Sequence, residues 1–180
     1  MEQAPGDFAL TMDELRTVAR FAAQSAEQSL PVFEAEDPAD PRPRAALDAA
    51  WAFADGAPRT ALQRTAAVEA HRAAKDVMTE AAQLAARASG DAAAAAYLHP
   101  IAKATQVGHI LRAAACAARV AELEAAGDAG AAAASLEAAR QRATPALIDV
   151  LSRYPAAPAG RGRVAELMRT LDSALRRAGG

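Results

Sequence analysis

The chain has only two lysines, and each follows a histidine by four residues, in the pairs His71–Lys75 and His99–Lys103. Side chains four residues apart lie on the same face of an α-helix. Histidine is the natural proton carrier at neutral pH, because its unperturbed pKa is about 6.5. A lysine beside other cations has a lowered pKa and can act as a base or a nucleophile. If the protein is an enzyme, these four residues and the third histidine, His109, are the candidates for catalysis.

A binding pocket forms if the two stretches of helix that carry these pairs pack face to face. Such a pocket would be cationic or nearly neutral and would favour a carboxylate or a phosphate. The predicted ligand-binding residues are the polar and aromatic side chains nearby: Arg72, Thr105, Gln106, Trp51 and Tyr97. The alternative is that the histidines and lysines are solvated surface residues, as such side chains usually are.

The segment 99–109 has a low helix propensity for so helical a chain, because it contains Pro100, Thr105, Val107 and Gly108. Departures from local consistency tend to mark functional or strained sites. The alternative for Gly108 is that it permits close approach of two helices. We therefore rank this segment above the His71 region as a functional candidate.

Other chemistries have less support in the sequence. No histidine spacing matches a zinc motif, and nearby lysines would oppose a cation, so we predict no metal and no cofactor. Cys116 lies in a run of alanines, where a small buried thiol is expected. The segment 160–163 has the wrong spacing for a Walker phosphate loop, although it leads into a helix N-terminus that could bind an anion.

Four acidic residues gather in the proline-rich segment 34–44, namely Glu34, Glu36, Asp37 and Asp40. One interpretation is a stiff, solvated linker between helices. The other is a partner-binding segment that faces a basic surface on another protein, where charge complementarity speeds association.

Composition predicts the fold class. Hydrophobic residues make up 52% of the chain but aromatic residues only 4%, because alanine dominates. Alanine is the strongest helix former, and residues that favour strands never alternate over a run. We expect an all-α, single-domain bundle of about six to seven antiparallel helices over residues 11–178, after a disordered tail over residues 1–10.

Charge and cysteine content limit the partners and the compartment. The net charge of −2 and the pI near 5.9 argue against a general nucleic-acid binder. One cysteine cannot form an intramolecular disulfide and suits a reducing cytoplasm. The uncharged stretch from Ala92 to Ile101 is too short to span a bilayer. We expect a cytoplasmic protein with neither nucleic acid nor membrane as partner.

Helix boundaries follow from local signals. Thr11 and Glu14 form a capping box at the first helix, and Pro31 is expected to end it. Pro100 should kink or split a later helix. The remaining helices are expected over residues 43–56, 60–90, 92–126, 145–151 and 162–178. One more, which holds Leu136, Glu137 and Arg140, is expected between the turn at Gly127 and Gly130 and the helix that begins at Pro145.

Several segments resemble one known family. They are Thr-Met-Asp-Glu-Leu-Arg at 11–16, Asp-Pro-Arg-Pro-Arg at 40–44, His-Arg-Ala-Ala at 71–74, Ala-Tyr-Leu-His-Pro at 96–100, Lys-Ala-Thr-Gln-Val-Gly-His-Ile at 103–110 and Pro-Ala-Leu-Ile-Asp-Val-Leu at 145–151. Together they are similar to the actinobacterial "putative immunity protein" family with an Imm-5-like domain. The resemblance implies a helical, cytoplasmic protein that neutralises a cognate protein toxin, and it supplies no catalytic residues.

Two functions remain open at this point. The first is an immunity protein that blocks a toxin through an exposed complementary surface. The second is a small helical enzyme or ligand-binding self-resistance protein with a His/Lys pocket for an anionic or polar small molecule. A homodimer that buries the alanine-rich stretches 92–96 and 131–134 is a further alternative. The position of His71 relative to His99 discriminates between the first two.

Overall fold

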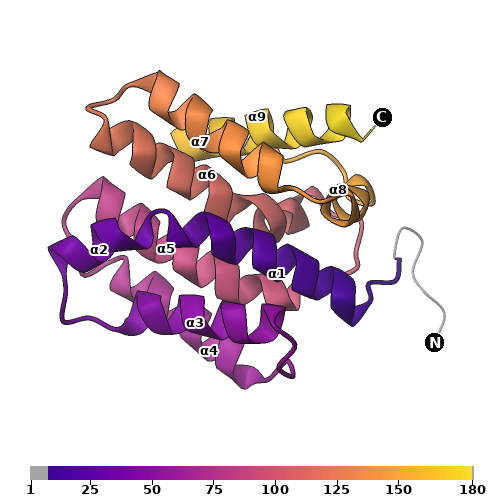
Figure 1. The fold of residues 1–180 in the computed structure, drawn as a ribbon, viewed down its shortest axis with the longest axis horizontal. Coiled ribbons are helices and arrows are strands. Elements are labelled where there is room, and N and C mark those ends of the chain that lie inside the picture. The colour runs from indigo at the N-terminus through magenta and orange to yellow at the C-terminus, as the bar shows by residue number, and fades with distance from the viewer. Residues whose placement is uncertain (1–7, 180) are drawn as a thin grey trace.

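The computed structural model describes residues 8–179, and this part of the chain is all-α, as predicted (Figure 1). It contains nine α-helices rather than the six to seven expected. They are α1 (Met12–Glu27), α2 (Leu30–Glu36), α3 (Arg42–Ala54), α4 (Ala61–Ala73), α5 (Glu80–Ala94), α6 (Val107–Glu124), α7 (Ala129–Arg142), α8 (Pro145–Ser152) and α9 (Arg163–Ala178). Two short 3₁₀ helices, Ala95–Tyr97 and Ala104–Gln106, lie between α5 and α6.

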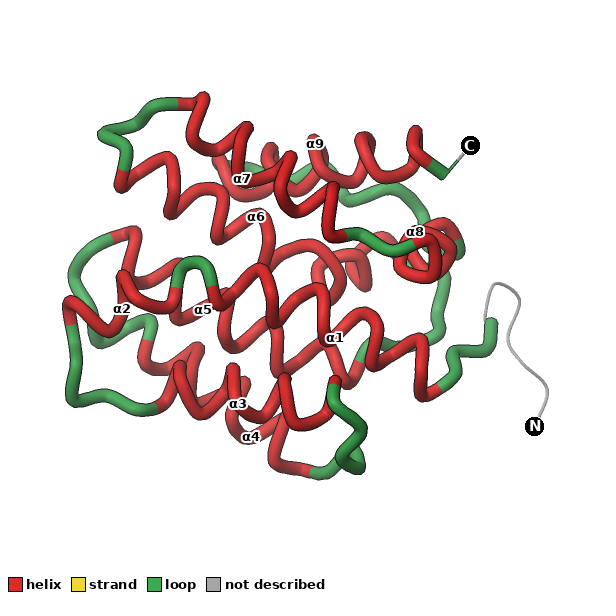
Figure 2. The backbone as a smooth tube through the Cα atoms, viewed as in Figure 1, coloured by secondary structure: helices red, strands yellow, loops and turns green. Residues whose placement is uncertain are grey.

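Two central helices organise the bundle. α5 packs against α1, α2, α3, α4 and α6, while α6 packs against α1, α5, α7 and α9. In Figure 1, α3 and α4 therefore lie on one side of the central pair, α7 and α9 lie on the other, and α1 crosses in front. Loops form the connections between helices and the two ends of the described chain (Figure 2).

The core has two parts of different composition. The larger part contains fully buried Leu, Ile and Phe side chains, among them Phe33, Phe53 and Ile110. The smaller part lies between α3, α4 and α5 and consists of alanines alone: Ala46, Ala49, Ala66, Ala67, Ala70 and Ala93. Methyl side chains let these three helices approach closely. The stretch 92–96 is buried within the bundle except for half-buried Ala94, so internal packing accounts for it without a dimer.

Several predicted helix signals are confirmed. Thr11 and Glu14 form the predicted capping box at the start of α1. α3 has Pro43 in its first turn and α8 begins at Pro145, close to the expected starts, and Thr144 caps α8. The final helix α9 also forms close to the expected bounds, and it buries Leu167, Met168, Leu171 and Leu175.

Three predicted boundaries are wrong. The helix expected over residues 60–90 is two helices, because the chain turns between Ala73 and Glu80. The break expected at Gly90 is absent, since Gly90 lies inside α5 and is buried. Tertiary packing outweighs the low helix propensity of this glycine. Pro31 ends no helix either, because it lies in the first turn of the separate helix α2.

Pro100 splits the helical pattern as expected, with non-helical residues between the two 3₁₀ helices. Leu98 and Lys103 both have extended backbone ψ angles, of 124° and 132°. Gln106 and Tyr154 hold this loop: the His99 amide donates to Gln106 Oε1 at 3.0 Å, and the Tyr154 hydroxyl donates to the His99 carbonyl at 2.9 Å.

The predicted disordered tail falls mostly on residues 1–7, which lie outside the described residues. Phe8 packs edge-on against Tyr154 with ring centroids 4.8 Å apart, and Arg153 donates to the Ala9 carbonyl. Within residues 8–179, no helix combines the length and the apolar character that crossing a membrane requires.

Candidate functional site

A buried carboxylate, Asp91, joins the three helices α4, α5 and α6. Asp91 is 4% exposed. Its Oδ2 accepts a hydrogen bond from Arg112 Nε of α6 at 3.0 Å, and its Oδ1 lies 3.5 Å from His71 Nε2 of α4. A buried carboxylate requires such partners, because an unpaired charge in the interior is costly.

Two glycines make room for the partners of Asp91. A Cβ atom at Gly90 would lie 2.9 Å from His71 Nε2 and 3.0 Å from the Ala67 carbonyl oxygen, so a larger residue would push α4 away. A Cβ atom at Gly108 would lie 3.1 Å from the Arg112 guanidinium carbon. Gly108 therefore accommodates an arginine side chain on its own helix.

A cavity of about 390 Å³ opens beside this cluster. It is lined by His71, Leu84, Arg87, Asp91, Arg112, Cys116 and Val164. Arg87 is exposed at its rim. Cys116 is buried, as predicted, and burial raises the pKa of its thiol, so the thiolate form is disfavoured at neutral pH.

His109 belongs to the same region. It lies on α6, one turn before Arg112, and is half-buried. Burial lowers the pKa of its imidazole, and the positive charge of Arg112 lowers it further, while Asp91 opposes and His99 adds to this effect. Its Nδ1 atom is buried and has no hydrogen-bond partner among the described residues. The lowered pKa favours the neutral imidazole, and Asp91 bonds to Arg112 rather than to His109.

The helical premise behind the two His–Lys pairs is wrong. α4 ends at Ala73, so Lys75 follows it in a turn where its amide donates to the Arg72 carbonyl. His99 and Lys103 lie at opposite ends of the loop around Pro100, not on one helix. Both lysines are exposed, and neither lines the cavity. The proposed catalytic roles of the three histidines and of Lys75 and Lys103 stay predictions.

The predicted ligand-binding residues are dispersed. Arg72 pairs with Glu69, and Thr105 is exposed. Gln106 holds the His99 loop. Trp51 lies beneath Arg20, with the guanidinium carbon 5.5 Å from the ring centroid. Tyr97 is covered by Arg64, with the guanidinium carbon 4.5 Å from its ring centroid. None of these five lines the cavity beside Asp91.

The acidic segment is largely satisfied within the molecule. Glu34 accepts two hydrogen bonds from Arg44, at 2.8 and 2.9 Å. Asp40 pairs with Arg42, and this guanidinium lowers the pKa of the carboxyl.

Glu36 serves the start of α5. It accepts from the Met78 and Thr79 amides at 2.5 and 3.2 Å, and from the Thr79 hydroxyl. The Thr79 hydroxyl and then the Met78 amide lower the pKa of Glu36. The partner-binding role predicted for Glu34, Glu36, Asp37 and Asp40 is untested, but three of these carboxylates already have intramolecular partners.

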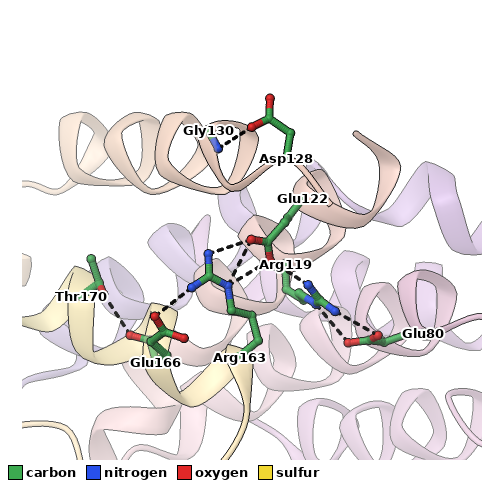
Figure 3. Close-up of polar contacts among 8 residues, drawn as sticks. All are labelled: Glu80, Arg119, Glu122, Asp128, Gly130, Arg163, Glu166 and Thr170. Atoms are coloured by element: carbon green, nitrogen blue, oxygen red, sulfur yellow. Dashed lines mark hydrogen bonds and ion pairs between the residues drawn. The ribbon is translucent and has the colours of Figure 1, made fainter. Parts of the chain in front are cut away.

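A second ionic network fixes the wall of the cavity that α9 supplies (Figure 3). Glu122 on α6 is 4% exposed and accepts from Arg163 at 2.7 Å and from Arg119 at 2.8 Å. Arg119 also reaches Glu80 on α5. Arg163, then Arg119, lowers the pKa of Glu122 to about 2. Arg163 is already paired with Glu122. The hypothesis of an anion site at residues 160–163 therefore has less support.

Sequence reasoning missed Asp91, Arg87 and Glu122 as members of these clusters. Arg87 and Asp91 are one helical turn apart and so lie on one face of α5. A predicted helix that ends at Gly90 does not contain Asp91, so it does not reveal that the two residues share a face. Arg112 was recognisable as part of a stripe with His109. The buried role of Glu122 depends on Arg163, which is 41 residues away in the chain.

The cluster suits recognition of an anion, and it places an imidazole beside a carboxylate. Arg87 and Arg112 supply positive charge at the cavity, and Asp91 restrains both Arg112 and His71. A histidine oriented by a carboxylate can act as a general base when a substrate lies beside it. Within residues 8–179, no three His, Cys, Asp or Glu side chains are grouped closely enough to hold a metal ion.

Comparison with known protein families identifies the family of this chain. A family model described as "Imm-5 like putative immunity protein" matches residues 9–146. The chain belongs to this family. No curated protein and no solved structure matches the chain. The part that matches the Imm-5-like family covers α1 to α7, with His71, Asp91 and Arg112, whereas Arg163 and Val164 of α9 lie beyond it.

Proposed function

We propose that the protein is an immunity protein that binds a cognate protein toxin and neutralises it in the cytoplasm of the bacterium that carries it. Membership of the Imm-5-like family over residues 9–146 is the observation that carries this proposal. The sequence segments around His71 and His99 that resemble the family point in the same direction.

The face around the α4–α5–α6 cavity is the better toxin-binding surface of the two considered. Arg87 is exposed there and takes part in no ion pair with the described residues, and Arg112 and His71 stand beside it. An acidic side chain of the toxin would find positive charge already oriented by Asp91. Segment 34–40 offers less, because its carboxylates are mostly paired.

The test is a protection assay followed by a binding measurement. Toxin domains encoded beside this gene are expressed in a sensitive host with and without the protein, and survival is scored. Binding of the protecting pair is then measured with Arg87→Glu and with the matched control Arg177→Glu at the far end of α9. We expect Arg87→Glu to weaken binding at least about tenfold and the control to have little effect. Survival that never depends on the protein would overturn the proposal.

The second candidate function is binding, and conversion, of an anionic small molecule in the same cavity. The pairing of His71 and Arg112 with one buried carboxylate beside a cavity of about 390 Å³ favours it. A thermal-shift screen of small anions tests this candidate. A shift that Arg112→Ala abolishes supports it, and a protein that no anion stabilises while a toxin does excludes it.

A further inference from the structure

Arg142, at the C-terminal end of α7, lies where two surface cavities meet. The first, of about 320 Å³, is lined mainly by α1 and includes Arg16, Arg20 and Thr144. The second, of about 400 Å³, lies between α1, α6 and α7 and is lined mostly by alanines, with Ser25 and Gln28. Arg142 lines both cavities. This region lies apart from the Asp91 cluster and shares no lining residue with that cavity.

The guanidinium of Arg142 has no counter-ion among residues 8–179. Its one hydrogen bond within that part of the chain is a long one, from Nη2 to Ser25 Oγ at 3.4 Å. Its Nε atom is buried and has no partner among the described residues, and burial lowers the pKa of the group. A guanidinium carries five N–H donors, so most of its donor capacity is unused. Partial burial of an unpaired charge is costly, and an anion that entered the cavity would remove that cost.

Arg16 and Arg20, which line the cavity of about 320 Å³ together with Arg142, are held in place by hydrogen bonds. Arg16 donates to Asp13 and to the Gly56 carbonyl, and its Nε is buried with no partner within residues 8–179. Arg20 donates to Asp55 at 2.7 Å and to the Ala54 carbonyl at 2.9 Å. Their positions are therefore fixed before any ligand arrives, which lowers the entropy cost of binding.

We propose that Arg142, supported by Arg16 and Arg20, binds a carboxylate group at this cavity. Three arginines stand against two aspartates, Asp13 and Asp55, which leaves one positive charge. One positive charge suits a carboxylate better than a doubly charged phosphate. A guanidinium can also donate two parallel hydrogen bonds to one carboxylate. This site goes beyond the proposed function, since it does not depend on which toxin the protein binds.

The carboxylate has two sources, a free dicarboxylate or a glutamate side chain of a protein, and two probes separate them. Glutarate and a hexaglutamate peptide are titrated into the full chain at constant ionic strength. Binding is followed by calorimetry and by the NMR signal of the Arg142 Nε–H group. Sodium chloride and inorganic phosphate serve as ionic controls.

Arg142→Gln and the matched variant Arg140→Gln test the residue itself. Arg140 lies on the same helix and is already paired with Glu137. We expect Arg142→Gln to weaken carboxylate binding at least about tenfold, Arg142→Lys to weaken it less, and Arg140→Gln to leave it unchanged. If Arg142→Gln fails to fold, Arg142→Lys and the Nε–H signal still decide.

Binding of glutarate alone assigns the site to a free acid, and binding of the peptide alone assigns it to a protein side chain. Both outcomes support the carboxylate site. The proposal is overturned if neither probe moves the Arg142 signal, if phosphate binds as tightly as the carboxylates, or if Arg140→Gln loses as much affinity as Arg142→Gln. Loss of toxin binding would not bear on this test, because no toxin is used in it.

Discussion

Arg112 lines the cavity beside Asp91 and Arg142 lines two other cavities of similar size, but only Arg112 has a buried carboxylate as partner. Arg112 pairs with Asp91 at 3.0 Å, and Asp91 also approaches His71. Arg142 pairs with no carboxylate among the described residues, and its burial opposes its charge. The ion pair of Arg112 therefore stabilises the native structure, whereas the partly buried, unpaired charge of Arg142 destabilises it. The same residue type contributes to stability beside Asp91 and remains available to bind an anion at the cavities that Arg142 lines.

Replacing Arg112 should have the largest effect. Arg112→Met leaves the buried Asp91 carboxylate with only His71 beside it, so we expect a loss of about 3 kcal/mol in the free energy of unfolding, measured by urea denaturation. The double variant Asp91→Asn, Arg112→Met should lose less than the sum of the two single variants. Additive losses would show that the two side chains are not coupled.

Gly90 and Gly108, which lie against the partners of Asp91, should respond differently to replacement by alanine. Gly90→Ala places a methyl group against the Ala67 carbonyl of α4, and we expect a net loss of about 1 to 2 kcal/mol despite the better helix propensity. Gly108→Ala meets only the movable Arg112 side chain, so its expected change is between zero and a gain of about 1 kcal/mol. Thermal unfolding of both variants measures the difference. Equal losses would mean that the spacing of α4 and α5 does not depend on Gly90.

Arg142→Met should change stability in the direction opposite to Arg112→Met. It removes a partly buried charge that has no counter-ion, so we expect a gain of about 0.5 to 1 kcal/mol in the absence of ligand. Arg140→Met, which breaks an exposed pair with Glu137, serves as the control and should change stability by less than about 0.5 kcal/mol. Destabilisation by Arg142→Met would assign the residue a structural role instead.

The smallest expected effect is the pH dependence from His109. Its pKa lies below the usual 6.5, because burial and Arg112 disfavour the protonated form. As the pH falls from 6.5 to that lower value, the unfolded chain binds more protons than the native state, so stability decreases. His109→Gln should flatten this part of the stability curve, while Asp91→Asn should lower the native pKa of His109 further. An NMR titration of the imidazole that gives an unshifted pKa would contradict this prediction.

The fold class was predictable because it rests on local properties. High alanine content and helical spacing of apolar residues require no knowledge of tertiary structure. Helix starts at Thr11, Pro43 and Thr144 carry strong local signals as well. The break at residues 74–79 could not be predicted in this way, because the stretch Ala74 to Thr79 contains neither glycine nor proline.

The candidate site was only partly predictable. His71, His109 and Arg112 do lie near one cluster, but no local signal in the sequence marks Asp91 as the residue that unites them. The helix end expected at Gly90 separated Asp91 from α5, whereas the small size of Gly90 serves the approach of α4 and not the end of a helix. The lysines were misplaced because their pairing with histidine assumed a continuous helix. Such errors arise wherever tertiary contacts override local signals.

The cap that Glu36 provides has a consequence for the order of folding. α1 and α4 begin with capping boxes made by residues three positions apart, so their first turns can form as soon as the local chain is free to do so. α5 uses its own Thr79, but its start also depends on Glu36, more than 40 residues earlier. The first turn of this central helix therefore becomes stable only after α2 has docked. Glu36→Gln should slow folding less than it speeds unfolding, and φ-value measurements on α1 and α5 would reveal this late step.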